Sequence, residues 1–245
     1  MQSLLLLSGL LCDETIWSDV ARRLTDRADV RIINFPDFKS IMDMAEHVLQ
    51  GAPDSFALAG HSMGGRVALE VLRRAPSRVT RIALLNTGVH PRRDAEFESR
   101  GRLVTLARER GMAALAAEWL PPMMGASASR VAEVMPSLTA MVERQTAQSF
   151  ASQTVAMLER PEAASILPTI AVPTLLLSGT ADRWSPLAQH AEMQRQSRRA
   201  TLVAVEDAGH MAPIEQPAAV ATALAEWLRA APAAMPQRVS PVDAN

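Results

Sequence analysis

Three residues far apart in the chain, Ser62, Asp182 and His210, have the types and the order needed for nucleophilic catalysis. A serine hydroxyl is a weak nucleophile until a neighbouring imidazole accepts its proton. Histidine suits this task because its pKa lies near neutrality, so the ring can take the proton and return it to a leaving group. A carboxylate on the second ring nitrogen fixes the tautomer and stabilises the imidazolium. These residues therefore predict attack by a serine with an imidazole as proton carrier.

The surroundings of Ser62 predict a sharp turn between a strand and a helix. Residues 60–65 read Gly-His-Ser-Met-Gly-Gly, with a strand-like run at 55–59 before them and a helix-like run at 66–72 after them. The glycines allow a strained backbone and a close approach of helix to strand. The hydroxyl would then stand at a helix N-terminus, where free N–H groups favour developing negative charge.

Asp182 and His210 also follow predicted strands. Apolar residues 175–177 lead to Asp182, and residues 201–205 lead to the loop that holds His210. Alone, an aspartate in such a place is usually a cap and a histidine is usually structural. Because parallel sheets place their sites beyond the carboxyl ends of the strands, the three positions can converge. The order serine, aspartate, histidine supports that interpretation.

Two backbone N–H groups are candidates for an oxyanion hole. One belongs to Met63, directly after the predicted nucleophile. The other belongs to Leu10, in the Ser-Gly-Leu-Leu loop that follows the first apolar strand at 3–7. Removing one such donor typically costs about 10²–10³ in rate.

Strand-like and helix-like runs alternate along most of the chain. The strand-like runs lie near 3–8, 30–35, 55–60, 79–86, 172–178 and 200–205. The helix-like runs lie near 14–25, 40–50, 63–75, 187–197 and 215–230. Apolar strands between amphipathic helices predict βαβ units, and therefore an α/β fold with a mostly parallel sheet of about six strands flanked by helices.

Residues 91–168 interrupt this alternation because they are helical throughout. We expect them to form a helical cap, inserted into a core made of 1–90 and 169–230 and lying above Ser62, and we expect the tail 231–245 to be disordered. The cap is rich in methionine, which repacks easily around apolar ligands. The candidate substrate-binding residues are His61, Arg66, Trp119, Met123 and Met211.

Composition narrows the function classes. The chain has 245 residues, is 48% hydrophobic and carries a net charge of −1, which does not favour nucleic acid or an anionic membrane as partner. Cys12 is the only cysteine, so no intramolecular disulfide can form and a reducing compartment is expected. The run 4–11 before Cys12 resembles a lipoprotein signal, but no basic residue precedes it, so we expect a cytoplasmic protein. No C-x-x-C or H-E-x-x-H pattern occurs, and we expect neither a metal nor another cofactor.

Together these motifs resemble the serine-dependent α/β-hydrolase superfamily over nearly the whole chain. The Gly-His-Ser-Met-Gly-Gly segment and the Ala-Gly-His near the end are most similar to small bacterial carboxylesterases, enol-lactonases and short-chain thioesterases. The resemblance implies an α/β-hydrolase fold, a catalytic Ser62–Asp182–His210 triad, a helical cap and a small-molecule ester, lactone or thioester substrate. Two departures are a first strand that already carries the oxyanion loop, and Ser8-Gly9 where many members have His-Gly.

Some enzymes of this fold catalyse other reactions, and single residues distinguish them. Dehalogenases and epoxide hydrolases have an aspartate where this chain has Ser62, which argues against both. The menaquinone-pathway lyase succinyl-hydroxy-cyclohexadiene-carboxylate synthase has an elbow resembling Gly-Tyr-Ser-x-Gly-Gly-Arg, and Arg66 holds that last position. The alternative for Arg66 is a helix residue that reaches a surface carboxylate. Cap arginines that would assist such a lyase are Arg102, Arg108, Arg110 or Arg144.

A third class comprises receptors of this fold that bind a small ligand without catalysis. Such proteins commonly lose a triad member, whereas this chain keeps all three residue types. The sequence does not distinguish a monomer from a homodimer.

Overall fold

The computed structural model describes residues 1–230, and the expected disordered tail lies outside them. Its centre is one six-stranded sheet in the order β2-β1-β3-β4-β5-β6, with every neighbouring pair parallel. The strands are β1 (Gln2–Leu7), β2 (Ala28–Ile33), β3 (Phe56–His61), β4 (Val79–Leu85), β5 (Thr174–Gly179) and β6 (Ala200–Val205). The predicted parallel sheet of about six strands is confirmed.

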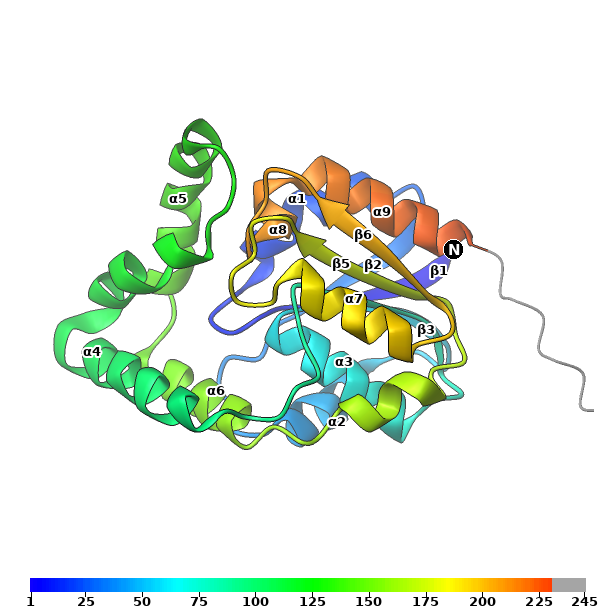
Figure 1. Cartoon of the computed structure of the whole chain (residues 1–245), viewed down its shortest axis with the longest axis horizontal. Helices are drawn as coiled ribbons and strands as arrows, with labels where there is room; N and C mark the ends of the chain where they lie inside the picture. Colours follow the sequence, from blue (N-terminus) through cyan, green and yellow to red (C-terminus); the bar gives the residue numbers. More distant parts are fainter. Residues whose placement is uncertain (231–245) are drawn as a thin grey trace, which may run out of the picture.

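Helices cover both faces of the sheet. Those of the alternating part are α1 (Ser18–Leu24), α2 (Ile41–Gly51), α3 (Met63–Arg74), α7 (Leu187–Gln196), α8 (Ala212–Glu215) and α9 (Pro217–Arg229). Helices α1 and α9 pack together on one face, and α2 and α3 pack together on the other (Figure 1). Strands β3 and β5 are buried along their whole length, which agrees with the apolar runs 56–59 and 175–177 inside them.

Two predicted helices are interrupted near their N-terminal ends. The predicted helix 14–25 begins as a 3-10 turn, η1 (Glu14–Ile16), capped by the Asp13 carboxylate, and α1 starts only at Ser18. The predicted helix 215–230 starts at Pro217, because proline suits the first turn of a helix and cannot continue one that arrives from before it.

The chain between β4 and β5 contains helices and no strand. These are α4 (Asp94–Trp119), η2 (Pro121–Met123), α5 (Ala128–Glu143), α6 (Ala147–Leu158) and η3 (Ala164–Thr169). Gly111 interrupts α4 with a φ of 82°, a conformation that glycine adopts without strain. Helix α4 packs on α5 and α6, and in Figure 1 α4 and α5 lie at the left, beyond the arrowheads of β5 and β6. We call residues 91–168 the insert.

Strained backbone gathers in the loops at the carboxyl ends of the strands. Among residues 1–230, the residues other than glycine with positive φ are Leu11, Ser62, Asn86 and Asp207, at 57°, 53°, 48° and 53°. Ser62 and Asn86 come directly after β3 and β4, and Leu11 and Asp207 lie in the loops after β1 and β6. Such strain is retained mainly where surrounding structure imposes it, and it concentrates at functional sites.

Candidate active site

The turn between β3 and α3 places Ser62 above the sheet. Its φ of 53° and ψ of −115° turn the chain sharply into the helix. A Cβ atom on Gly60 would lie 2.2 Å from the Gly64 carbonyl oxygen, and one on Gly64 would lie 2.3 Å from the Leu7 carbonyl oxygen. Glycine is therefore required on both sides of Ser62. The Thr87 hydroxyl secures the turn by donating to the Ser62 carbonyl at 2.7 Å.

The structure brings Ser62, His210 and Asp182 into one hydrogen-bonded series. His210 Nε2 lies 2.9 Å from Ser62 Oγ, and His210 Nδ1 lies 3.0 Å and 3.2 Å from the two Asp182 carboxylate oxygens. Because an ionised carboxylate only accepts, Nδ1–H donates to Asp182, which leaves Nε2 free to accept from the serine hydroxyl. This is the geometry in which the imidazole can remove the serine proton.

Three further donors fix the Asp182 carboxylate. The N–H groups of Trp184 and Ser185 donate to Oδ1 at 2.8 and 2.9 Å, and the Asn86 side-chain amide donates to Oδ2 at 2.9 Å. Burial alone would raise the pKa of Asp182, but the hydrogen bonds from His210 and Asn86 outweigh it and hold that pKa well below its usual range. The exposed carboxylate of Asp207 instead accepts from Gln216.

Asn86 and Trp184 were missed by sequence reasoning. Asn86 is fully buried at the end of β4, and a polar residue directly after a buried strand was the available signal. Its side-chain amide also donates to the Gly209 carbonyl at 3.1 Å. One side chain therefore links Asp182 to the loop that carries His210, residues 206–211, which we call the histidine loop. The Trp184 ring is 40% exposed and lies against the His210 ring, with 5.9 Å between the ring centroids.

The buried carboxylate of Glu215 clamps the histidine loop to the insert. One oxygen accepts from the N–H groups of Gly209 and Met211, on either side of the histidine, at 2.9 and 3.1 Å. The other accepts from the N–H groups of Gly125 and Ala126 in the insert, both at 2.7 Å. The residue is fully buried, and nothing in the local sequence signals this role because its partners belong to two separate loops.

The insert contacts the histidine loop through its backbone as well. The His210 N–H donates to the Met123 carbonyl at 2.7 Å.

His61, at the end of β3, also contacts the histidine loop. Its Nε2 lies 2.8 Å from the His210 carbonyl oxygen. Burial, followed by the charge of His210, lowers the pKa of His61 to about 3. His61 is therefore neutral, its Nε2–H donates to the His210 carbonyl, and its ring forms part of the wall of the site. Its Nδ1 faces Gly9, where a Cβ atom would lie 2.9 Å away.

Leu10 and Met63 both line the pocket in front of Ser62. Met63 is the first residue of α3, where N–H groups lack partners inside the helix. The loop that carries Leu10 is held from the insert, because the Leu11 N–H donates to Gln153 Oε1 at 2.8 Å. Gln153 in turn donates to the Phe35 carbonyl at 2.5 Å. Sequence reasoning missed Gln153.

A cavity of about 90 Å³ opens at Ser62 and is lined from both the sheet loops and the insert. All five candidate substrate-binding residues, His61, Arg66, Trp119, Met123 and Met211, line it. Its apolar part combines Trp119 and Met123 of the insert with Leu10 and Met211. Cys12 also faces the cavity, and burial followed by the charge of Asp13 raises the pKa of its thiol to about 12.

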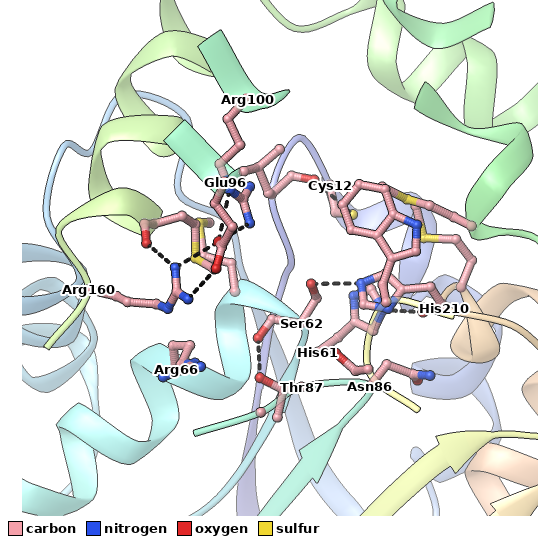
Figure 2. A pocket seen from close by; sticks show the side chains of 18 of the residues that line it. Cys12, His61, Ser62, Arg66, Asn86, Thr87, Glu96, Arg100, Arg160 and His210 are labelled. Carbon is pink, nitrogen blue, oxygen red and sulfur yellow. Dashed lines mark hydrogen bonds and ion pairs between the residues drawn. The ribbon is translucent and has the colours of Figure 1, made fainter. Parts of the chain in front are cut away.

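The other part of the cavity is charged. Arg66, Glu96, Arg100 and Arg160 line it (Figure 2). Arg66 does not reach a surface carboxylate: it is 5% exposed and donates to the His90 carbonyl at 2.7 Å.

The arginines that the insert contributes differ from those expected. Arg100 and Arg160 line the cavity, whereas Arg102, Arg108, Arg110 and Arg144 do not. Arg102 pairs with Glu118, and Arg144 pairs with Asp13 at 2.7 Å. For Arg102 the reason is helix geometry, since it follows Arg100 by two residues and residues two apart on a helix point in nearly opposite directions.

This fold and site agree with the comparison to known families. The model of the family described as "Alpha/beta hydrolase family" matches residues 4–223. The chain belongs to the alpha/beta hydrolase family.

Solved structures of this hydrolase fold align over nearly the full length. An esterase from Thermogutta terrifontis, in a malate-bound structure, is 28% identical with a TM-score of 0.83, over 94% of this chain and 90% of that one. The enol-lactonase from Burkholderia xenovorans LB400 is 23% identical with a TM-score of 0.81, over 93% and 92%. MenH from S. aureus is 20% identical with a TM-score of 0.80, over 93% of each chain. The last two likenesses establish the fold alone.

Two kinds of feature are absent from the described residues. Between residues 1 and 230, no three histidine, cysteine, aspartate or glutamate side chains group closely enough to hold a metal ion. In the same part of the chain, no helix combines the length and apolarity needed to cross a bilayer.

Proposed function

We propose that this hydrolase cleaves a carboxylic ester, lactone or thioester of a small molecule through an acyl-enzyme on Ser62. The observation that carries the proposal is the series Ser62 Oγ–His210–Asp182, with bonds of 2.9 and 3.0 Å, opening into a cavity. No other acidic side chain of the described chain makes a hydrogen bond to the His210 ring, so the carboxylate role belongs to Asp182.

The proposed reaction has two halves. Ser62 Oγ attacks the carbonyl carbon while His210 Nε2 accepts the hydroxyl proton, and the N–H groups of Leu10 and Met63 hold the oxyanion. The tetrahedral intermediate collapses, and His210 returns the proton to the departing alcohol or thiol. Water then attacks the acyl-enzyme with His210 as base, which releases the acid and restores the serine hydroxyl.

We also propose that residues 91–168 act as a cap domain on a core of 1–90 and 169–230. The support is that Trp119 and Met123 form part of the cavity wall, while Glu215 and Gln153 bind the insert to the loops around Ser62. The insert would thereby shape the substrate side of the site and exclude water from it.

Hydrolysis of p-nitrophenyl esters from acetate to dodecanoate tests the proposal. Ser62→Ala should lower kcat by at least about 10³-fold, and Asp182→Asn by about 10⁴-fold with the fold intact. Ser129→Ala, an exposed serine on α5, is the matched control and should keep the wild-type rate. Hydrolysis that survives in Ser62→Ala would overturn the proposal, and the chain-length profile would size the acyl pocket.

A second candidate is a lyase that uses the same three residues to remove a proton from a polyanionic substrate. The observation that favours it is the presence of Arg66, Arg100 and Arg160 in the cavity. A folded wild-type protein that hydrolyses no ester, and whose Tm rises with polyanionic carboxylates, would favour this second function over the first.

A further inference from the structure

The cavity has a charged end on the opposite side of Ser62 from His210. In Figure 2, Ser62 lies between His210 on one side and Arg66, Arg160 and Glu96 on the other. Arg66 belongs to α3, one turn after Ser62, whereas the other charged residues come from the insert. A substituent of a substrate whose carbonyl lies at Ser62 can therefore extend into this end of the cavity.

Positive charge exceeds negative charge at this end. Among the described residues that line the cavity, there are three guanidinium groups and one carboxylate, that of Glu96. Both Glu96 oxygens are already engaged: Arg160 donates to them at 2.7 and 3.0 Å, and Arg100 donates to one at 3.3 Å. Glu96 thus serves two arginines, and no carboxylate in the described chain pairs with the third, Arg66.

Arg66 is buried with part of its hydrogen-bonding capacity unused. Its Nη2 donates to the His90 carbonyl, while Nη1 is buried and has no partner in the described chain. Nε of Arg160, whose side chain is 2% exposed, is also without a partner there. Burial, followed by the charge of Arg160, lowers the pKa of Arg66 to about 9, so its surroundings oppose its charge. Buried donors left unpaired are costly, and a bound anion would satisfy them.

The chemistry of the unpaired groups defines the ligand. A guanidinium presents a planar fork of donors that matches a carboxylate, and charge-assisted bonds of this kind are the stronger ones. One negative charge neutralises one unpaired guanidinium, and a single carboxylate supplies that charge.

We infer that Arg66 forms a subsite for one carboxylate group of the substrate, so that the ester cleaved at Ser62 is a monoanion, such as the half-ester of a dicarboxylic acid. The inference rests on the proposed ester hydrolysis. It differs from the polyanion expected of the lyase, because Glu96 already neutralises much of the remaining positive charge.

Two matched pairs of esters test the subsite. In the first, p-nitrophenyl hemiadipate is compared with its methyl ester, which places or removes the charge on the acyl side. In the second, 3-acetoxybenzoate is compared with methyl 3-acetoxybenzoate, which does the same on the leaving-group side. For one pair we expect kcat/KM of the charged ester to exceed that of the neutral ester by about 10- to 100-fold, mainly through KM. Equal values in both pairs would refute the inference.

Variants connect the preference to Arg66. Arg66→Met should bring the ratio of kcat/KM values in the preferred pair close to one, and Arg66→Lys should leave an intermediate ratio because it keeps charge without the planar fork. Arg102→Met removes an exposed arginine of the insert that does not line the cavity, and it should keep the wild-type ratio. A wild-type ratio in Arg66→Met would overturn the inference.

Other readouts separate failure of the subsite from failure of the proposed function. Hydrolysis that persists in Ser62→Ala refutes an acyl-enzyme on Ser62, and with it the proposed function, whatever the charge preference. If Arg66→Met does not fold, inhibition of the wild-type enzyme by adipate is compared with inhibition by adipamide. Adipate should inhibit at least about 10-fold more strongly, and equal inhibition would refute the subsite.

Discussion

Replacement of Glu215 by glutamine tests the clamp between the histidine loop and the insert. The two carboxylate oxygens accept four backbone N–H bonds, two each, at 2.7 to 3.1 Å. A glutamine side chain keeps one oxygen and replaces the other with an NH₂ group, which cannot accept. Whichever way the amide points, two bonds are lost and the two N–H groups that lose them face another donor.

The loss of stability follows from these bonds. A hydrogen bond to a charged group contributes about 1.5–3 kcal/mol, so two of them account for about 3–6 kcal/mol. In a chain of this size each kcal/mol shifts Tm by about 2–4 °C, which predicts a Tm lower by about 6–24 °C for Glu215→Gln. Because two of the four N–H groups flank His210 and the other two hold the insert against its loop, we also expect kcat to fall by about 10-fold or more while KM changes less.

Thermal unfolding followed by circular dichroism measures the first effect, and p-nitrophenyl butyrate hydrolysis well below Tm measures the second. Glu192→Gln is the control, since Glu192 is exposed on α7 and should leave both quantities unchanged. A Glu215→Gln variant that melts within about 2 °C of the control would show that the four bonds do not contribute as calculated.

Two further predictions concern backbone strain and acid sensitivity. Ser62→Gly should be more stable than Ser62→Ala by about 1–2 kcal/mol, because the φ of 53° strains any residue with a Cβ; equal Tm values would contradict this. Burial opposes the shift of the Glu96 pKa, but hydrogen bonding from Arg160 outweighs it and lowers that pKa from 4.5 to about 2. The stability contributed by the ionised form is therefore present above pH 4.5 and is lost as the pH falls through about 2. Urea unfolding should show a smaller stability loss between pH 6 and pH 3 for Glu96→Gln than for wild type, and parallel losses would argue against the shift.

Much of the fold could be predicted from local patterns. The alternation of apolar strands and amphipathic helices indicates a parallel sheet because each strand must be covered on both faces. The glycine-rich turn around Ser62 could also be predicted from a local pattern, since a Cβ atom at position 60 would lie 2.2 Å from the Gly64 carbonyl oxygen and only glycine avoids this clash. The order of Ser62, Asp182 and His210 was also sufficient to predict their proximity at the carboxyl edge of the sheet.

What the tertiary structure decided is how the polar groups are paired. Arg100 rather than Arg102 faces the cavity, because the rotation of α4 is set by its packing on α5 and α6, which the sequence of one helix does not specify. Glu215 accepts a hydrogen bond from Gly125, 90 residues earlier in the chain, and Gln153 accepts one from Leu11, 142 residues earlier. A buried polar group must be satisfied by whatever the fold places beside it. The sequence by itself therefore determined which residue types follow the strands that meet at Ser62, because local patterns specify strands and turns. The packed structure determined which polar groups support them and which buried donor, Arg66 Nη1, is left without a partner in the described chain.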